Sequence, residues 1–97
     1  MSVPIEKVYK QIGQIAEKYD VKKIVLFGSR ARGTNHAKSD IDLAVYGCNK
    51  FELLKDSLNE DLWSLLELDI INMDNKNISP ELVSEIERDG VVLYEKI

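Results

Sequence analysis

An uninterrupted apolar run, Ile24 to Phe27, limits the folds open to this chain more than any other feature. A short run of strand-forming residues with no polar alternation predicts a strand buried on both faces. Gly28 and Ser29 follow directly and end the strand, and Ala31 falls in a predicted short helix. The chain is therefore expected to leave the interior of a sheet at Gly28.

Longer helices are predicted from apolar spacing and from end signals. Apolar residues at three- and four-residue steps predict a helix over about 4–19. A second helix is predicted from five apolar residues that share one helical face: Phe51, Leu54, Leu58, Leu62 and Leu65. Ser79 as N-cap and Pro80 at the first position predict the start of a third, which Gly90 would end as its C′ residue.

Strand patterns separate these helices along the chain. Residues 40–46 and 68–71 predict two further strands, and residues 91–94 predict a last strand at a sheet edge. Strands that alternate with helices favour an α/β (α+β) fold with one small sheet. Because 97 residues are too few for two full domains, residues 1–97 are expected to form a single domain.

Composition and charge argue against a membrane protein and against a nucleic-acid-binding protein. No apolar run approaches the ~18 residues of a membrane span, and residues 1–10 lack a signal core, so a cytoplasmic protein without membrane contact is expected. The formal net charge of -4 argues against direct nucleic-acid binding. Residues 22–38 nevertheless hold five basic residues and no acidic one, which favours an anionic ligand.

Three aspartates stand within the strand patterns, where carboxylates are unwelcome unless they are paired or bind metal. Asp40 and Asp42 share one strand face because side chains alternate with a period of two. Asp69 lies on a separate strand, and all three converge if the two strands are neighbours. Taken singly, each is more often a surface acid, but oxygen-only ligands in convergence suit Mg²⁺ or Mn²⁺.

A phosphate-binding turn is predicted just upstream of these carboxylates. Gly28 lets the backbone approach a ligand closely, and the Ser29 hydroxyl with nearby N–H groups can bind phosphate oxygens. Arg30 and Arg32 either add charge-assisted bonds to phosphate or face solvent. A phosphate cradle beside a carboxylate pair is typical of metal-assisted phosphoryl or nucleotidyl transfer.

The spacing of these residues resembles a known signature. Ten residues separate Gly28-Ser29 from Asp40-x-Asp42, as in the G-S-x10-D-x-D pattern of polymerase β-like nucleotidyltransferases, and Asp69 matches the third carboxylate. The short chain is similar to the minimal nucleotidyltransferases, which are the antitoxin half of HEPN–MNT toxin–antitoxin pairs. The resemblance implies a polymerase β-like core.

The resemblance also implies an activity and residue roles. AMP would pass from ATP to a tyrosine of a partner HEPN ribonuclease toxin, and Mg²⁺ (or Mn²⁺) would be held by Asp40 and Asp42 and shared with Asp69. Asp69 would also accept the proton of the attacking hydroxyl. Gly28 and Ser29 would hold the β- and γ-phosphates.

Some alternatives stay open. The same site would serve an aminoglycoside-type small-molecule nucleotidyltransferase, and a non-catalytic antitoxin could simply mask its partner. Both a homodimer and a hetero-oligomer with the toxin are compatible with the sequence. Trp63 is expected either at the core edge or as an interface anchor. The acids Glu81, Glu85 and Glu87 are expected to form a solvated helix face.

Overall fold

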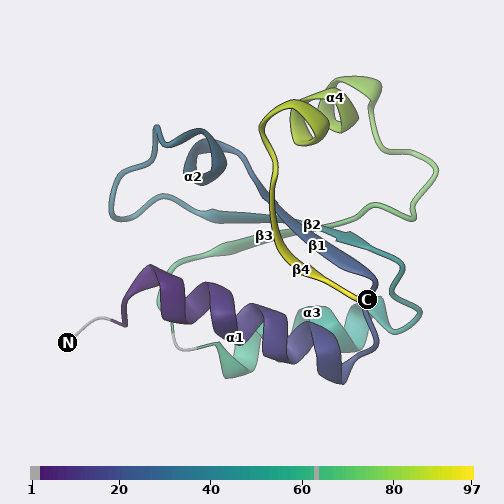
Figure 1. The fold of residues 1–97 in the computed structure, drawn as a ribbon, viewed down its shortest axis with the longest axis horizontal. Helices are drawn as coiled ribbons and strands as arrows, with labels where there is room; N and C mark the ends of the chain where they lie inside the picture. Colours follow the sequence, from purple (N-terminus) through teal and green to yellow (C-terminus); the bar gives the residue numbers. More distant parts are fainter. Residues whose placement is uncertain (1–2, 63) are drawn as a thin grey trace.

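The computed structural model describes residues 3–62 and 64–97, so the prediction for Trp63 lies outside the described residues. Within these residues four helices and four strands follow one another in the predicted order (Figure 1). Their bounds are α1 (Ile5–Lys18), β1 (Lys23–Phe27), α2 (Ser29–Arg32), β2 (Ile41–Tyr46), α3 (Phe51–Asp61), β3 (Leu68–Asn72), α4 (Pro80–Asp89) and β4 (Val91–Glu95). None of the described helices is both long enough and apolar enough to span a membrane.

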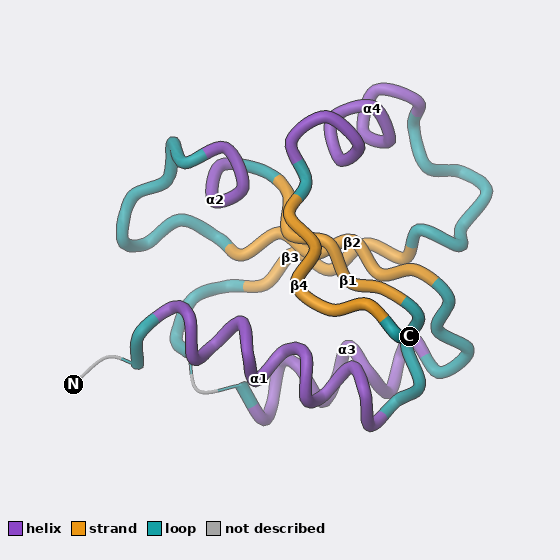
Figure 2. The backbone as a smooth tube through the Cα atoms, viewed as in Figure 1, coloured by secondary structure: helices purple, strands orange, loops and turns teal. Residues whose placement is uncertain are grey.

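The strands form one mixed sheet (Figure 2). Their order in the sheet is β3-β2-β1-β4. β1 runs antiparallel to both β2 and β4, whereas β2 and β3 are parallel. The helix α3 connects β2 to β3, as a parallel pair requires. The α/β (α+β) prediction is thus confirmed, and β4 is the edge strand that the sequence predicts.

The two faces of the sheet are covered by different helices (Figure 1). α1 and α3 pack on one face and enclose the larger core, to which β2 contributes Ile41, Leu43 and Val45. α2 and α4 lie on the other face, over a smaller cluster that includes Ala44. Because side chains alternate along a strand, Asp42 points to the α2 and α4 face. The polar residues of β2 are thereby kept out of the larger core.

The helix α3 is shorter than predicted. It ends at Asp61, and Leu62 already has extended backbone (φ -70°, ψ 134°). The prediction of Leu62 and Leu65 on the helical face is therefore wrong. Leu62 packs against the core from outside the helix, and Leu65 is fully exposed, at 104% of its reference area. The apolar spacing continues past the point where the chain must turn toward β3.

The helix α4 begins as predicted but ends for a different reason. The Ser79 Oγ accepts a hydrogen bond from the Leu82 N–H at 3.2 Å, and Pro80 occupies the first helical position. Gly90 has an extended backbone (φ -64°, ψ 144°) and not the left-handed backbone of a C′ glycine. Glycine is required at this position because a larger residue would clash. A Cβ there would lie 2.3 Å from the Ile86 carbonyl oxygen and 2.5 Å from Val25 Cγ1.

Candidate active site

Gly28 and Asp42 lie in direct contact where β1 ends and β2 begins. Phe27 pairs with Asp42 in the antiparallel register, which brings the next residue of β1 alongside the carboxylate. Gly28 has φ +75° and ψ -156°, a backbone region that is almost exclusive to glycine. A Cβ on Gly28 would lie 2.1 Å from Asp42 Oδ2. The glycine therefore lets the predicted phosphate-binding turn touch the predicted metal-binding carboxylate.

The three aspartates gather at one end of the sheet. Asp42 and Asp69 are register partners on the parallel strands β2 and β3, as the sequence requires for convergence. Asp40 lies just before β2, so the strand begins one residue later than predicted. Across residues 3–62 and 64–97, no three His, Cys, Asp or Glu side chains are arranged to hold a metal ion. The three-carboxylate metal site stays a prediction.

The electrostatics around Asp42 nevertheless suit a cation. Burial raises the pKa of the Asp42 carboxyl, and the negative charges of Asp69, Asp40 and Glu85 raise it further. Arg32 acts in the opposite direction and lowers this pKa. A divalent cation would relieve the repulsion among these carboxylates, and their oxygen-only chemistry fits Mg²⁺ or Mn²⁺.

The two arginines of the motif have different surroundings. Arg30 holds the loop that precedes β2, because its Nε donates to the Ser39 carbonyl (3.0 Å) and its Nη2 to the carbonyls of Ala37 (3.2 Å) and His36 (3.4 Å). These bonds fix the chain directly before Asp40. The sequence did not indicate these contacts, and phosphate binding by Arg30 stays a prediction.

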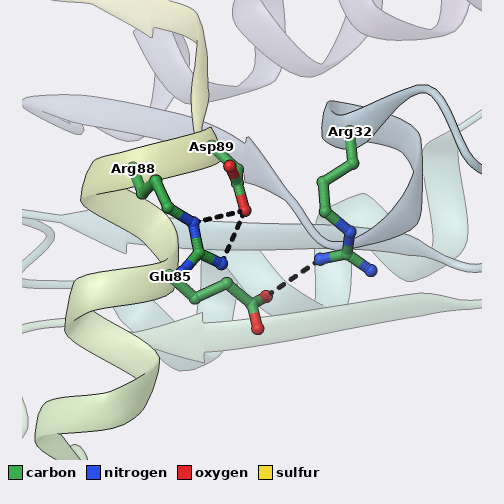
Figure 3. A network of polar contacts seen from close by, with 4 residues as sticks. All are labelled: Arg32, Glu85, Arg88 and Asp89. Carbon is green, nitrogen blue, oxygen red and sulfur yellow. Dashed lines mark hydrogen bonds and ion pairs between the residues drawn. The ribbon is translucent and has the colours of Figure 1, made fainter.

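Arg32 reaches from α2 to Glu85 of α4, on the same face of the sheet (Figure 3). Its Nη1 lies 3.6 Å from Glu85 Oε2, and both side chains are partly exposed. The expectation of a fully solvated face is therefore wrong for Glu85, although Glu81 and Glu87 are exposed as expected. Helical spacing places Glu85 on α4 but cannot reveal which residue of another element lies opposite. The fold brings this acid to the site.

A groove of about 900 Å³ opens beside Asp40, and neither Asp42 nor Asp69 is among its lining residues. It is lined by Arg30 and Asp40, by the start of α1, and by the described residues of the segment between α3 and β3, among them Leu62 and Leu66. Grooves with an apolar lining and a few charged groups are typical ligand sites. The sequence did not indicate this groove, because its walls come from three separate segments.

Comparisons with known proteins agree with this geometry. Residues 10–97 match the family model described as polymerase beta, nucleotidyltransferase. Over 72 residues the chain is 33% identical to the protein adenylyltransferase MntA of Shewanella oneidensis, and the match covers 73% of this chain and 52% of MntA. The chain thus spans about half the length of this curated relative.

Solved structures share the fold. A toxin–antitoxin crystal structure with AMP-PNP superposes with a TM-score of 0.65 and 24% identity, covering 91% of this chain and 73% of the other. A mutant of the MntA–HpeT toxin–antitoxin gives a TM-score of 0.64 and 22% identity over the same shares of both chains. The family match extends over most of the sequence and includes the Gly28–Asp42 contact. This chain is therefore a nucleotidyltransferase of the polymerase β family.

Proposed function

We propose that this protein is an antitoxin that transfers AMP from ATP to a tyrosine hydroxyl of a partner HEPN ribonuclease toxin in the cytoplasm. The observation that carries the proposal is the Gly28–Asp42 contact, which joins a phosphate-binding turn to a carboxylate crowded by like charge. Support comes from the likeness to MntA, which is named a protein adenylyltransferase, and from similar structures that are toxin–antitoxin complexes.

Each residue of the candidate site has its own role in the proposed reaction. The Gly28 backbone and the Ser29 hydroxyl bind the β- and γ-phosphates, and Asp40, Asp42 and Asp69 would hold Mg²⁺ or Mn²⁺. When bound, this cation supplies positive charge to the phosphates and to the attacking oxygen. Asp69 accepts the proton of the tyrosine hydroxyl. The tyrosine oxygen then bonds to the α-phosphorus, the bond from the α-phosphorus to the bridging oxygen breaks, and pyrophosphate leaves.

The acceptor must approach without blocking the phosphate turn. Gly28 lies on the β1 side of Asp42 and Asp69 on the β3 side, so the three follow the order of the strands. An in-line displacement needs the attacking and leaving oxygens on opposite sides of the phosphorus. In this proposal the acceptor attacks from the β3 side, and Asp69 on that side accepts its proton.

Intact mass spectrometry tests the proposal. A HEPN protein, sought among the products of the adjacent genes, would be incubated with the wild type, Mg²⁺ and ATP, and in parallel with Asp42→Asn. A matched control, Asp56→Asn, removes an exposed acid from α3 on the opposite face of the sheet. We expect AMP additions with the wild type and with Asp56→Asn, and none with Asp42→Asn.

Two other results would favour the alternative functions, which are masking of the partner and transfer to a small molecule. A partner that binds tightly but stays unmodified would contradict the proposal and favour neutralisation by masking. A partner that neither binds nor gains mass would favour a small-molecule acceptor such as an aminoglycoside. Native mass spectrometry of the same samples would separate a homodimer from a hetero-oligomer with the toxin.

A further inference from the structure

Arg32 is directed by a residue that lies outside the signature. It stands three positions after Ser29 in α2, so the two side chains lie on the same side of that helical turn. From there Arg32 extends toward α4, where its Nη1 meets Glu85 Oε2 at 3.6 Å (Figure 3). This contact uses one terminal nitrogen. Figure 3 shows the other terminal nitrogen of the guanidinium pointing away from Glu85.

The neighbouring acid, Asp89, has Arg88 as its main partner, although the charge of Arg32 also lowers the pKa of the Asp89 carboxyl. Asp89 accepts hydrogen bonds from Arg88 Nε at 3.1 Å and from Arg88 Nη2 at 2.9 Å, and Figure 3 shows this pair beside the Arg32–Glu85 contact. Arg88 thus compensates the charge of Asp89. Glu85 is the carboxylate of α4 with which Arg32 makes an ion pair.

The helix α4 is fixed firmly enough to direct another side chain. Ile86, next to Glu85, is buried at 3% exposure in the cluster with Val25 and Phe27 of β1. At the end of α4, the Gly90 N–H donates a hydrogen bond of 2.8 Å to the Ile86 carbonyl. Glu85 therefore has a defined position relative to the end of β1, where the phosphate turn begins.

We infer that Glu85 is a positioning residue, which holds Arg32 across the site so that the other terminal nitrogen of its guanidinium donates to the phosphates of bound ATP. The inference rests on the proposed function, because it needs a nucleotide at Gly28 and Ser29. It adds α4 to a nucleotide site that the signature confines to β1, α2 and β2.

Charge repulsion alone predicts the opposite effect of Glu85 on nucleotide affinity. Glu85 is close enough to Asp42 to raise the pKa of that carboxyl, so its negative charge also repels a polyphosphate. If Glu85 acted only through its charge, removing it would tighten nucleotide binding. If it positions Arg32, removing it weakens binding, because a mobile arginine must be ordered when the ligand binds.

The experiment measures the affinity of the whole protein for AMP-PNP with Mg²⁺ by calorimetry, in a double-mutant cycle. The variants are Glu85→Gln, Glu85→Ala, Arg32→Ala and the Arg32→Ala/Glu85→Ala pair. Glu87→Gln is the control, since it removes the same charge from an exposed position two residues along α4. Thermal melts of each variant without nucleotide confirm folding.

We expect both Glu85 variants to weaken AMP-PNP binding by about two- to fivefold, the range of a partly exposed ion pair. Glu85→Ala should have no further effect once Arg32 is alanine, because Glu85 acts through Arg32. The KM for ATP should rise by the same factor with kcat within about twofold, while Glu87→Gln binds as the wild type does.

Unchanged or tighter binding by the Glu85 variants would overturn the inference and leave the proposed function intact. An equal effect of Glu85→Ala in both backgrounds would also overturn it, because Glu85 would then act without Arg32. A wild-type protein that does not bind AMP-PNP would overturn the nucleotide site itself and the inference with it.

Discussion

Asp42 and Asp69 occupy facing positions on the parallel strands β2 and β3. Burial of Asp42, with the charges of Asp69 and Asp40, raises the pKa of the Asp42 carboxyl in the folded protein. An acid whose pKa is higher in the folded state opposes folding when it is ionised, and this penalty disappears as the pH falls through the folded pKa. The arrangement therefore lowers the stability of the cation-free protein at neutral pH.

Asp42→Asn is expected to stabilise the protein and abolish its activity. Without the charge, the melting temperature in EDTA at pH 7 should rise by about 2–4 °C, and the gain should shrink as the pH is lowered. AMP transfer should fall by about 10²-fold or more, because a group that stabilises developing charge is lost. A variant that melts below the wild type in EDTA would contradict the repulsion argument.

Gly28→Ala is expected to disrupt the site. The new Cβ would clash with Asp42 Oδ2 in a backbone conformation that disfavours any side chain, at a cost of about 1–3 kcal/mol. AMP transfer should fall by about 10²-fold or more. The control is Gly33→Ala, because Gly33 also has positive φ (+78°) but has open space around its Cβ position. Equal losses of activity in the two variants would contradict the Gly28–Asp42 contact.

Arg30→Lys is expected to loosen the loop before β2. A lysine cannot reproduce the three hydrogen bonds to backbone carbonyls that fix residues 36–39. Amide hydrogen exchange over residues 34–40 should accelerate, and AMP transfer should fall by about 10-fold as Asp40 loses its support. The loop over residues 73–79 is an internal control. Unaltered exchange at residues 34–40 would disprove the structural role of Arg30.

Gly90→Ala and Gly13→Ala are expected to change stability in opposite directions. Gly90 has no room for a Cβ, so alanine should destabilise the protein by about 1–3 kcal/mol. Gly13 lies inside α1, and its nearest heavy atom to a new Cβ, Tyr94 Cδ1, is 3.7 Å away. Alanine there should stabilise by about 0.5–1 kcal/mol. Urea unfolding of both variants measures the two changes, and a shared sign would contradict the steric argument.

The order of the elements was predictable because each carries its own local signal. The run Ile24 to Phe27, the spacing in α1 and the Ser79-Pro80 cap depend only on neighbouring residues, and the structure confirms each. The end of α3 was not predictable. The apolar spacing through Leu62 and Leu65 carries no sign that the chain must turn there toward β3.

The candidate site was predictable where it follows from spacing alone. The alternation of strands and helices placed Asp42 and Asp69 on separate strands linked by a helix, and the structure supplies the condition for convergence, because the two strands are parallel neighbours. The contacts of Arg30 and Glu85 could not be predicted, since each depends on how separate elements pack. A single sequence shows which face of a helix is polar, and only the folded chain shows what that face meets.

The division of the sheet into two differently covered faces has a consequence for how such a protein can change over generations. Substitutions at core residues that do not line the groove, such as Leu58 and Val45, change the stability of the fold without altering the groove beside Asp40. Substitutions on α2 and α4, for example at Arg32 or Glu85, change the charge near Asp42 while the larger core keeps the chain folded. The charged end of the sheet can therefore vary while the larger core preserves the scaffold.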